Sequence, residues 1–118
     1  MSPAEYDARR RAFKRECMFL SETSGWRSIE RNEAVGGKPG SKHVYGMGND
    51  YSAPTQVLLE RAKKIAVEKY GFWVEVHNVG SGMHLHIQGL APGDPPKEWI
   101  DLYGEETGWT LVASTSMS

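Results

Sequence analysis

The chain has 118 residues, of which 39% are hydrophobic and 25% charged, and its net charge is −1. This composition is typical of a globular protein, and the length fits a single domain spanning residues 1–118. A nearly neutral chain has no overall field to attract nucleic acid or anionic lipid, and no apolar run is long enough to cross a bilayer.

The chain begins with MSPAEYDARRRAFKRE, which is charged where a signal peptide is apolar. We therefore expect synthesis in the cytoplasm without a secretion signal. A helix is predicted from Pro3 to about Leu20, because proline suits a first turn and apolar residues recur at helical spacing. The stretch from Ser21 to Ala53 is rich in glycine and lacks periodicity, and loops of this length are usually functional or disordered. Trp26 and Tyr45 provide apolar anchors that argue against disorder.

The segment SAPTQVLLERAKKIAVEKYG predicts the clearest helix, with Thr55 as its N-cap and Gly71 at its end. Five apolar residues recur at helical spacing and predict its buried face: Val57, Leu58, Ala62, Ile65 and Ala66. Farther along, we expect a short helix near Trp99 and a last strand near Trp109.

Two alternating runs, FWVEVHN and MHLHIQG, flank VGSG and predict a β-hairpin with a four-residue loop. Placing Val76 opposite Leu85 gathers the apolar side chains on one face: Val74, Val76, Met83, Leu85 and Ile87. The other face then carries Glu75 opposite His86 and His77 opposite His84. Helices combined with such a hairpin predict an α+β fold, a small antiparallel sheet with flanking helices.

The four histidines fall in two places, His43 in the glycine-rich stretch and three on the hairpin. A catalytic zinc needs three protein ligands from His, Asp or Glu and one open position. His43, Asp50 and either His84 or His86 meet that count, while Glu75, His77 or the remaining hairpin histidine could move protons. Taken alone, each group also fits an ordinary solvated polar surface.

The segment SGWRSIERNEAVGGKPGSKHVYGMGND resembles the signature of the zinc D-Ala-D-Ala carboxypeptidase family. That family belongs to a group with the lysostaphin-type peptidases and the hedgehog signalling domain. Its hallmark, Ser-x-His-x-x-Gly-x-Ala-x-Asp, is matched by Ser41, His43, Gly46 and Asp50, with Gly48 in place of the alanine. The downstream HLH matches the second metal segment, so the signature region spans residues 24–88.

The resemblance implies a zinc site whose ligands are His43, Asp50 and His86. It further implies that His84 supports the attacking water and the oxyanion, that Arg27 binds a substrate carboxylate or carbonyl, and that Ser41 contacts substrate near the ligand loop. Related enzymes often carry an acid/base carboxylate just before the last histidine, but residues 80–83 offer none. The hairpin register supplies Glu75 in its place.

The fold implied by the resemblance is hedgehog/D-Ala-D-Ala peptidase-like, and the implied activity is hydrolysis of peptidoglycan stem peptides. The enzyme is either a D,D-carboxypeptidase or an L-Ala-D-Glu endopeptidase, and its size resembles a phage endolysin. We expect a monomer that acts on the cell wall once released, with no nucleic-acid or membrane partner. One alternative is a zinc-containing binding module that has lost catalysis, which the missing carboxylate near His84 favours. A second is a mononuclear iron site of two histidines and one carboxylate.

Overall fold

The computed structural model describes residues 1–25, 29–34, 46–79, 82–92 and 97–107. These residues form α1 (Pro3–Glu16), β1 (Ser21–Ser24), α2 (Ile29–Ala34), β2 (Gly48–Ser52), α3 (Gln56–Glu68), β3 (Trp73–Val79), β4 (Gly82–Gln88) and α4 (Lys97–Thr107). None of the helices in these ranges is both long and apolar enough to cross a membrane. The strand predicted near Trp109 lies outside the described residues.

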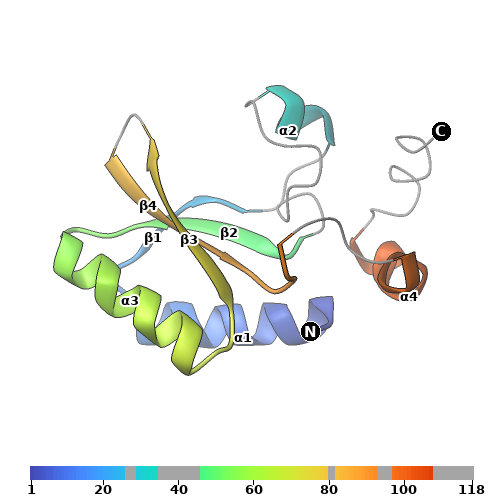
Figure 1. Ribbon diagram of the computed structural model, residues 1–118, viewed down its shortest axis with the longest axis horizontal. Helices are drawn as coiled ribbons and strands as arrows, with labels where there is room; N and C mark the ends of the chain where they lie inside the picture. Colours follow the sequence, from blue (N-terminus) through green and yellow to red (C-terminus); the bar gives the residue numbers. More distant parts are fainter. Residues whose placement is uncertain (26–28, 35–45, 80–81, 93–96, 108–118) are drawn as a thin grey trace.

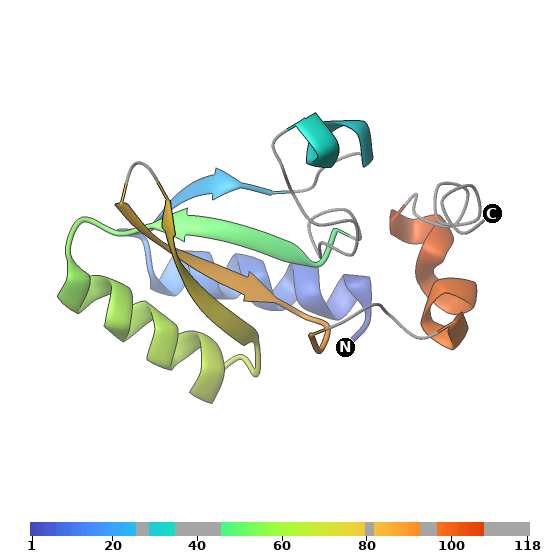
Figure 2. The same ribbon diagram turned by 45° about the horizontal axis from the view of Figure 1, so that its top comes forward.

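The four strands form one antiparallel sheet in the order β1-β2-β4-β3. Helices α1 and α3 both lie against one face of this sheet, as the two views in Figures 1 and 2 show. The chain therefore has the predicted α+β fold, and β4 is an inner strand with a neighbour on either side.

The predicted register of the hairpin is confirmed pair by pair. Val76 lies opposite Leu85, and the polar pairs, Glu75 with His86 and His77 with His84, fall where they were expected. The ladder runs farther than predicted, because Val79 and Gly82, assigned to the loop, form its last pair. Gly82 has φ +117°, a conformation that side chains with a Cβ rarely adopt.

The core lies between the sheet and the helices α1 and α3. Its buried apolar residues are Tyr6, Phe13, Cys17, Leu20, Met47, Tyr51, Leu59, Ala62, Ala66, Phe72, Leu85, Ile87, Leu90 and Trp99. Leu85 and Ile87 of β4 are fully buried, and Val74 and Val76 of β3 pack partly buried against the core. Met83 belongs to the same face but is 42% exposed, since it lies near the hairpin end.

Helix α3 has the predicted ends and, except at one position, the predicted buried face, with Ala62 and Ala66 buried and Ile65 packed partly buried against the core. The Thr55 side chain accepts a hydrogen bond from the Leu58 backbone, and Gly71 adopts φ +69° where the chain leaves the helix. The placement of Val57 in the buried face is wrong, because this side chain is 77% exposed and Leu59 is buried instead. The two positions are about 200° apart around a helix, so they cannot share a narrow stripe.

The stretch from Ser21 to Ala53, expected to be irregular, contains β1, α2 and β2. Both strands lack the alternation of apolar and polar residues that marks a half-buried strand. In β2 the reason is Asn49, a polar residue on the core-facing side of the strand that is nevertheless buried. In β1 three of the four residues are exposed.

The first and last described helices lie close to their predicted positions. Helix α1 begins at Pro3, with the Ser2 side chain accepting a hydrogen bond from the Glu5 backbone, but it ends at Glu16, four residues before the predicted end. Helix α4 includes Trp99, whose side chain is buried.

Candidate functional site

The polar face of the sheet carries a row of side-chain positions that runs across all four strands. Asp50 of β2 pairs with Ser24 of β1 on one side and with His86 of β4 on the other, and His86 in turn pairs with Glu75 of β3. Residues paired directly in antiparallel strands project from the same face. The fold therefore brings together Asp50 and His86, 36 positions apart in the sequence, as the hairpin alone could not predict.

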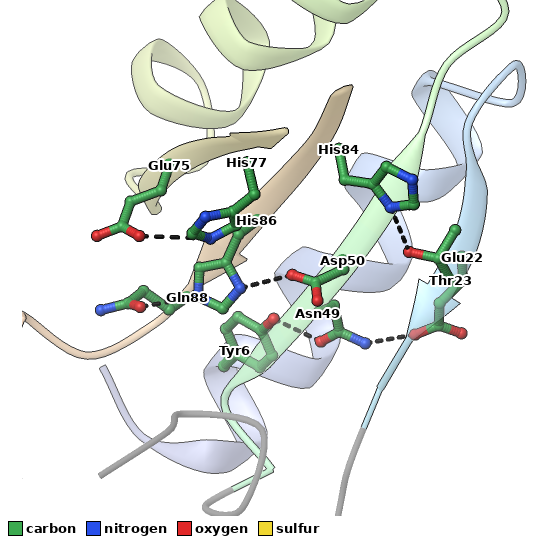
Figure 3. A network of polar contacts seen from close by, with 10 residues as sticks. All are labelled: Tyr6, Glu22, Thr23, Asn49, Asp50, Glu75, His77, His84, His86 and Gln88. Atoms are coloured by element: carbon green, nitrogen blue, oxygen red, sulfur yellow. Dashed lines mark hydrogen bonds and ion pairs between the residues drawn. The ribbon is translucent and has the colours of Figure 1, made fainter. Parts of the chain in front are cut away.

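Asp50 and His86 are in direct contact. Nδ1 of His86 lies 2.7 Å from Oδ1 of Asp50 (Figure 3), and the imidazole is almost fully buried while the carboxylate is mostly so. Two ligands of one tetrahedral zinc ion lie about 3.4 Å apart when each is about 2.1 Å from the metal. The 2.7 Å contact is a hydrogen-bond distance, so the two groups would have to move apart by about 0.7 Å to share a zinc ion, but they are donor types that zinc accepts and they already face each other.

The other ring nitrogen of His86 has its own partner. Nε2 lies 2.8 Å from Oε1 of Gln88, and the Gln88 amide nitrogen donates to the Leu90 carbonyl at 2.7 Å. Gln88 is only 9% exposed. The histidine ring is thus held at both nitrogens, by Asp50 on one side and Gln88 on the other (Figure 3).

His84 lies one row away on the same face, in register with Ser52 of β2 and His77 of β3. Its Nδ1 is 3.1 Å from Oγ1 of Thr23 on β1. Thr23 occupies the irregularity in the β1–β2 register between Glu22 and Ser24, the kind of bulge that re-aims a side chain. An edge strand absent from the sequence prediction therefore orients the His84 ring.

Glu75 lies beside His86 in the register, as predicted, but its carboxylate contacts a different histidine. Oε2 of Glu75 is 3.4 Å from Nε2 of His77, and both side chains are substantially exposed. The His77 ring meets the His86 ring edge-on, with 5.7 Å between centroids. Glu75 and His77 thus form a pair at the border of the site.

On the opposite face, a chain of hydrogen bonds holds β2 in place. The Tyr6 hydroxyl donates to Oδ1 of Asn49 at 2.5 Å, and the Asn49 amide donates to Oε1 of Glu22 (Figure 3). Burial raises the pKa of the Tyr6 phenol above its ordinary value, so this donor keeps its proton. The network therefore holds Asn49, the residue next to Asp50, from the core side of the sheet.

The predicted site residues divide into two groups. Asp50, His84, His86 and Glu75 lie on one face of the sheet, whereas His43, Ser41 and Arg27 lie outside the described residues. Within the described residues, no group of three His, Cys, Asp or Glu side chains could hold a metal ion. Asp50 and His86, two of the three ligands predicted from the sequence, are in contact.

Three residues of these networks were not predicted from the sequence: Gln88, Thr23 and Asn49. Gln88 could have been found, since it follows His84 and His86 at alternate positions of one strand and so shares their face. Thr23 and Asn49 gave no such indication, because neither of their strands was predicted.

The family model of Peptidase M15 matches residues 7–89 of the chain, from α1 to the end of β4. The match includes Asp50, Glu75, His84 and His86. Searches of curated proteins and of solved structures gave no significant match.

Proposed function

The chain belongs to the Peptidase M15 family, and on this basis we propose that it is a zinc-dependent peptidase that hydrolyses the stem peptides of peptidoglycan. The observation that carries the proposal is the contact between Asp50 and His86 on neighbouring strands. One residue comes from the glycine-rich segment that resembles the family signature and the other from the HLH segment. Their meeting on one face of the sheet is what a metal site shared by the two segments requires.

In the proposed site, His43, Asp50 and His86 hold the zinc ion. When bound, zinc supplies the Lewis acidity that activates a water molecule and polarises the scissile carbonyl. Asp50 contributes a negative charge and the imidazole a neutral nitrogen, the donor types that zinc accepts in catalytic sites. The low exposure of His86 excludes bulk water from one side of this pair.

The remaining polar side chains are proposed to bind substrate and to move protons. His84, held by Thr23 Oγ1, stabilises negative charge on the carbonyl oxygen of the cleaved peptide bond. Glu75 takes a proton from the attacking water and delivers it to the leaving amine. Arg27 binds a carboxylate or carbonyl of the substrate, and Ser41 contacts substrate near the ligand segment.

The bond that is cut is the D-Ala-D-Ala bond in a D,D-carboxypeptidase or the L-Ala-D-Glu bond in an endopeptidase of the endolysin type. We propose that the protein acts as a monomer on the cell wall after release from the cytoplasm. A second candidate function is a zinc-containing binding module without catalysis. It is favoured by the Glu75 carboxylate, which contacts His77 and is largely exposed.

Digestion of purified peptidoglycan by the zinc-loaded protein, followed by mass spectrometry of the products, tests the proposal. Release of free D-alanine identifies the carboxypeptidase, and new amino-terminal D-glutamate identifies the endopeptidase. Asp50→Ala should abolish both the bound zinc and the products. Intact peptidoglycan with one zinc bound per chain would instead support the binding module, and iron in place of zinc on metal analysis would support the iron site.

A further inference from the structure

We propose that Gln88 is a positioning residue that fixes the tautomer of His86, so that Nε2 carries the proton and Nδ1 offers its lone pair to the metal. The part of this inference that concerns zinc rests on the proposed function. The part that concerns the tautomer rests only on hydrogen bonds among His86, Gln88, Leu90 and Asp50.

The direction of the hydrogen bonds follows from the chemistry of the acceptor at Leu90. A backbone carbonyl can only accept, so the group 2.7 Å from Leu90 O must be the amide nitrogen of Gln88. The amide oxygen then faces Nε2 of His86 at 2.8 Å. A flipped amide would set two acceptor oxygens against each other in a buried place. Because the Gln88 oxygen can only accept, the proton must be on Nε2.

The same hydrogen bond determines that Nδ1, the other ring nitrogen, carries a lone pair when the ring is neutral. In a neutral ring with its proton on Nε2, the lone pair on Nδ1 points toward Oδ1 of Asp50, 2.7 Å away. Two acceptors at this distance repel unless a cation lies between them, either a proton or a metal ion. Histidines that bind metals almost always donate their other N–H to an oxygen, which orients the ring and raises its basicity as a ligand.

The backbone after β4 is shaped to hold the Gln88 amide. The Gly89 N–H donates to the Met47 carbonyl at 3.0 Å, and a Cβ at position 89 would lie 2.6 Å from the Tyr6 ring. Only glycine lets the chain pass this close to the ring. The close passage brings the next carbonyl, that of the buried Leu90, back to the Gln88 side chain.

Three variants test the proposal. Gln88→Leu removes the acceptor with little change in volume. Gln88→Glu, with its buried carboxyl protonated, retains an acceptor oxygen opposite Nε2 and a donor to the Leu90 carbonyl. Gln56→Leu, on the exposed start of α3, makes the same chemical change away from the site. Thermal unfolding of each variant establishes that it is folded before metal binding is measured.

Zinc affinity is measured by competition with a chromophoric chelator. We expect Gln88→Leu to weaken zinc binding by about 10–100-fold, the usual effect of losing such a partner. Gln88→Glu should stay close to the wild-type affinity, and Gln56→Leu should not change it. Unchanged affinity in folded Gln88→Leu would overturn the proposed role, as would an equal loss in Gln88→Glu, which would indicate a merely structural one.

Long-range ¹H–¹⁵N correlation spectra of the metal-free wild-type protein read the tautomer directly. Nε2 of His86 should carry a proton in this protein, whether or not a second proton lies between Nδ1 and Asp50. A ring with its proton on Nδ1 and none on Nε2 would overturn the proposal, even if Gln88→Leu fails to fold. If the wild-type protein bound no zinc but showed the Nε2–H tautomer, the zinc site would fail while the role of Gln88 in setting the tautomer would stand.

Discussion

The two faces of β4 carry opposite kinds of residue on one short strand. Leu85 and Ile87 are fully buried against α1 and α3, whereas His84, His86 and Gln88 each have a polar partner on the other face. Buried apolar side chains stabilise the fold in proportion to the area removed from water, while the polar row carries the proposed site. We therefore expect that stability and function can be changed separately in this strand by substitutions at adjacent positions.

The largest expected effect is a loss of activity without a loss of zinc, in the variant His84→Ala. The substitution removes a proton-carrying or oxyanion-stabilising group, so peptide cleavage should fall by about 10²–10⁴-fold. Zinc content should remain near one per chain, because Asp50 and His86 are untouched. Metal analysis and a cleavage assay on the same sample check both parts. Loss of zinc in this variant would show that His84, rather than His86, is the ligand.

A substitution at the next position, Leu85→Ala, should have the opposite effect: it should lower stability and leave zinc binding and activity unchanged. Removing a fully buried leucine costs about 2–5 kcal/mol of unfolding free energy, which urea denaturation measures. Zinc stoichiometry and activity should stay close to wild type at temperatures where the variant remains folded. Loss of zinc from the folded variant would contradict the claim that the two faces of β4 act independently.

A smaller effect on activity is expected from Glu75→Gln, which retains size and hydrogen bonding but removes the base. Zinc should stay bound, and cleavage should fall by about a hundredfold. His77→Ala is the informative companion, since the Glu75 carboxylate contacts His77 in the structure. An equal loss in both variants would assign proton transfer to the pair. Near wild-type cleavage by Glu75→Gln would transfer the role to a histidine.

The smallest effect is expected at a contact far from the polar row. Glu16 accepts hydrogen bonds from the Tyr70 hydroxyl and the Lys69 ammonium, which join the end of α1 to the end of α3. These bonds, chiefly that from Tyr70, lower the pKa of Glu16 below its ordinary value of 4.5. A lowered pKa gives stability above about pH 4.5 that is lost as the pH falls through the folded value.

Glu16→Gln should therefore lower the Tm slightly at neutral pH, and the difference from wild type should shrink in acid. Zinc affinity should not change, since the contact lies on the helical side of the sheet. Thermal melts across pH 3–7 measure the effect. A difference that grows on acidification would contradict the assigned sign.

The hairpin was the most predictable part of the structure. From Val74 to His77 and from Met83 to Gln88 its apolar and polar residues alternate, so a shift of one position would place Leu85 in water and His84 in the core. That constraint alone predicted the pairs of His77 with His84 and Glu75 with His86, which the structure confirms. The cap at Thr55 was equally local and equally predictable.

The partners of these residues across the sheet were not predictable in the same way. Asp50 was a candidate ligand by residue type and by the family resemblance, but its strand was not predicted, because β2 carries the buried Asn49 where an apolar residue would reveal a strand. Asn49 is tolerated there because Tyr6 and Glu22 satisfy its amide, a long-range arrangement with no local pattern. Thr23 was missed for a similar reason, since its strand is exposed and bulged.

Binding of one zinc ion by Asp50 and His86 is tested most directly by crystallography of the zinc-loaded protein at the zinc absorption edge. The anomalous difference map should contain one peak per chain, about 2.0–2.2 Å from a carboxylate oxygen of Asp50 and from Nδ1 of His86. His43 should supply the third protein ligand. A peak on His84 or His77 that leaves the Asp50–His86 contact intact would contradict the site.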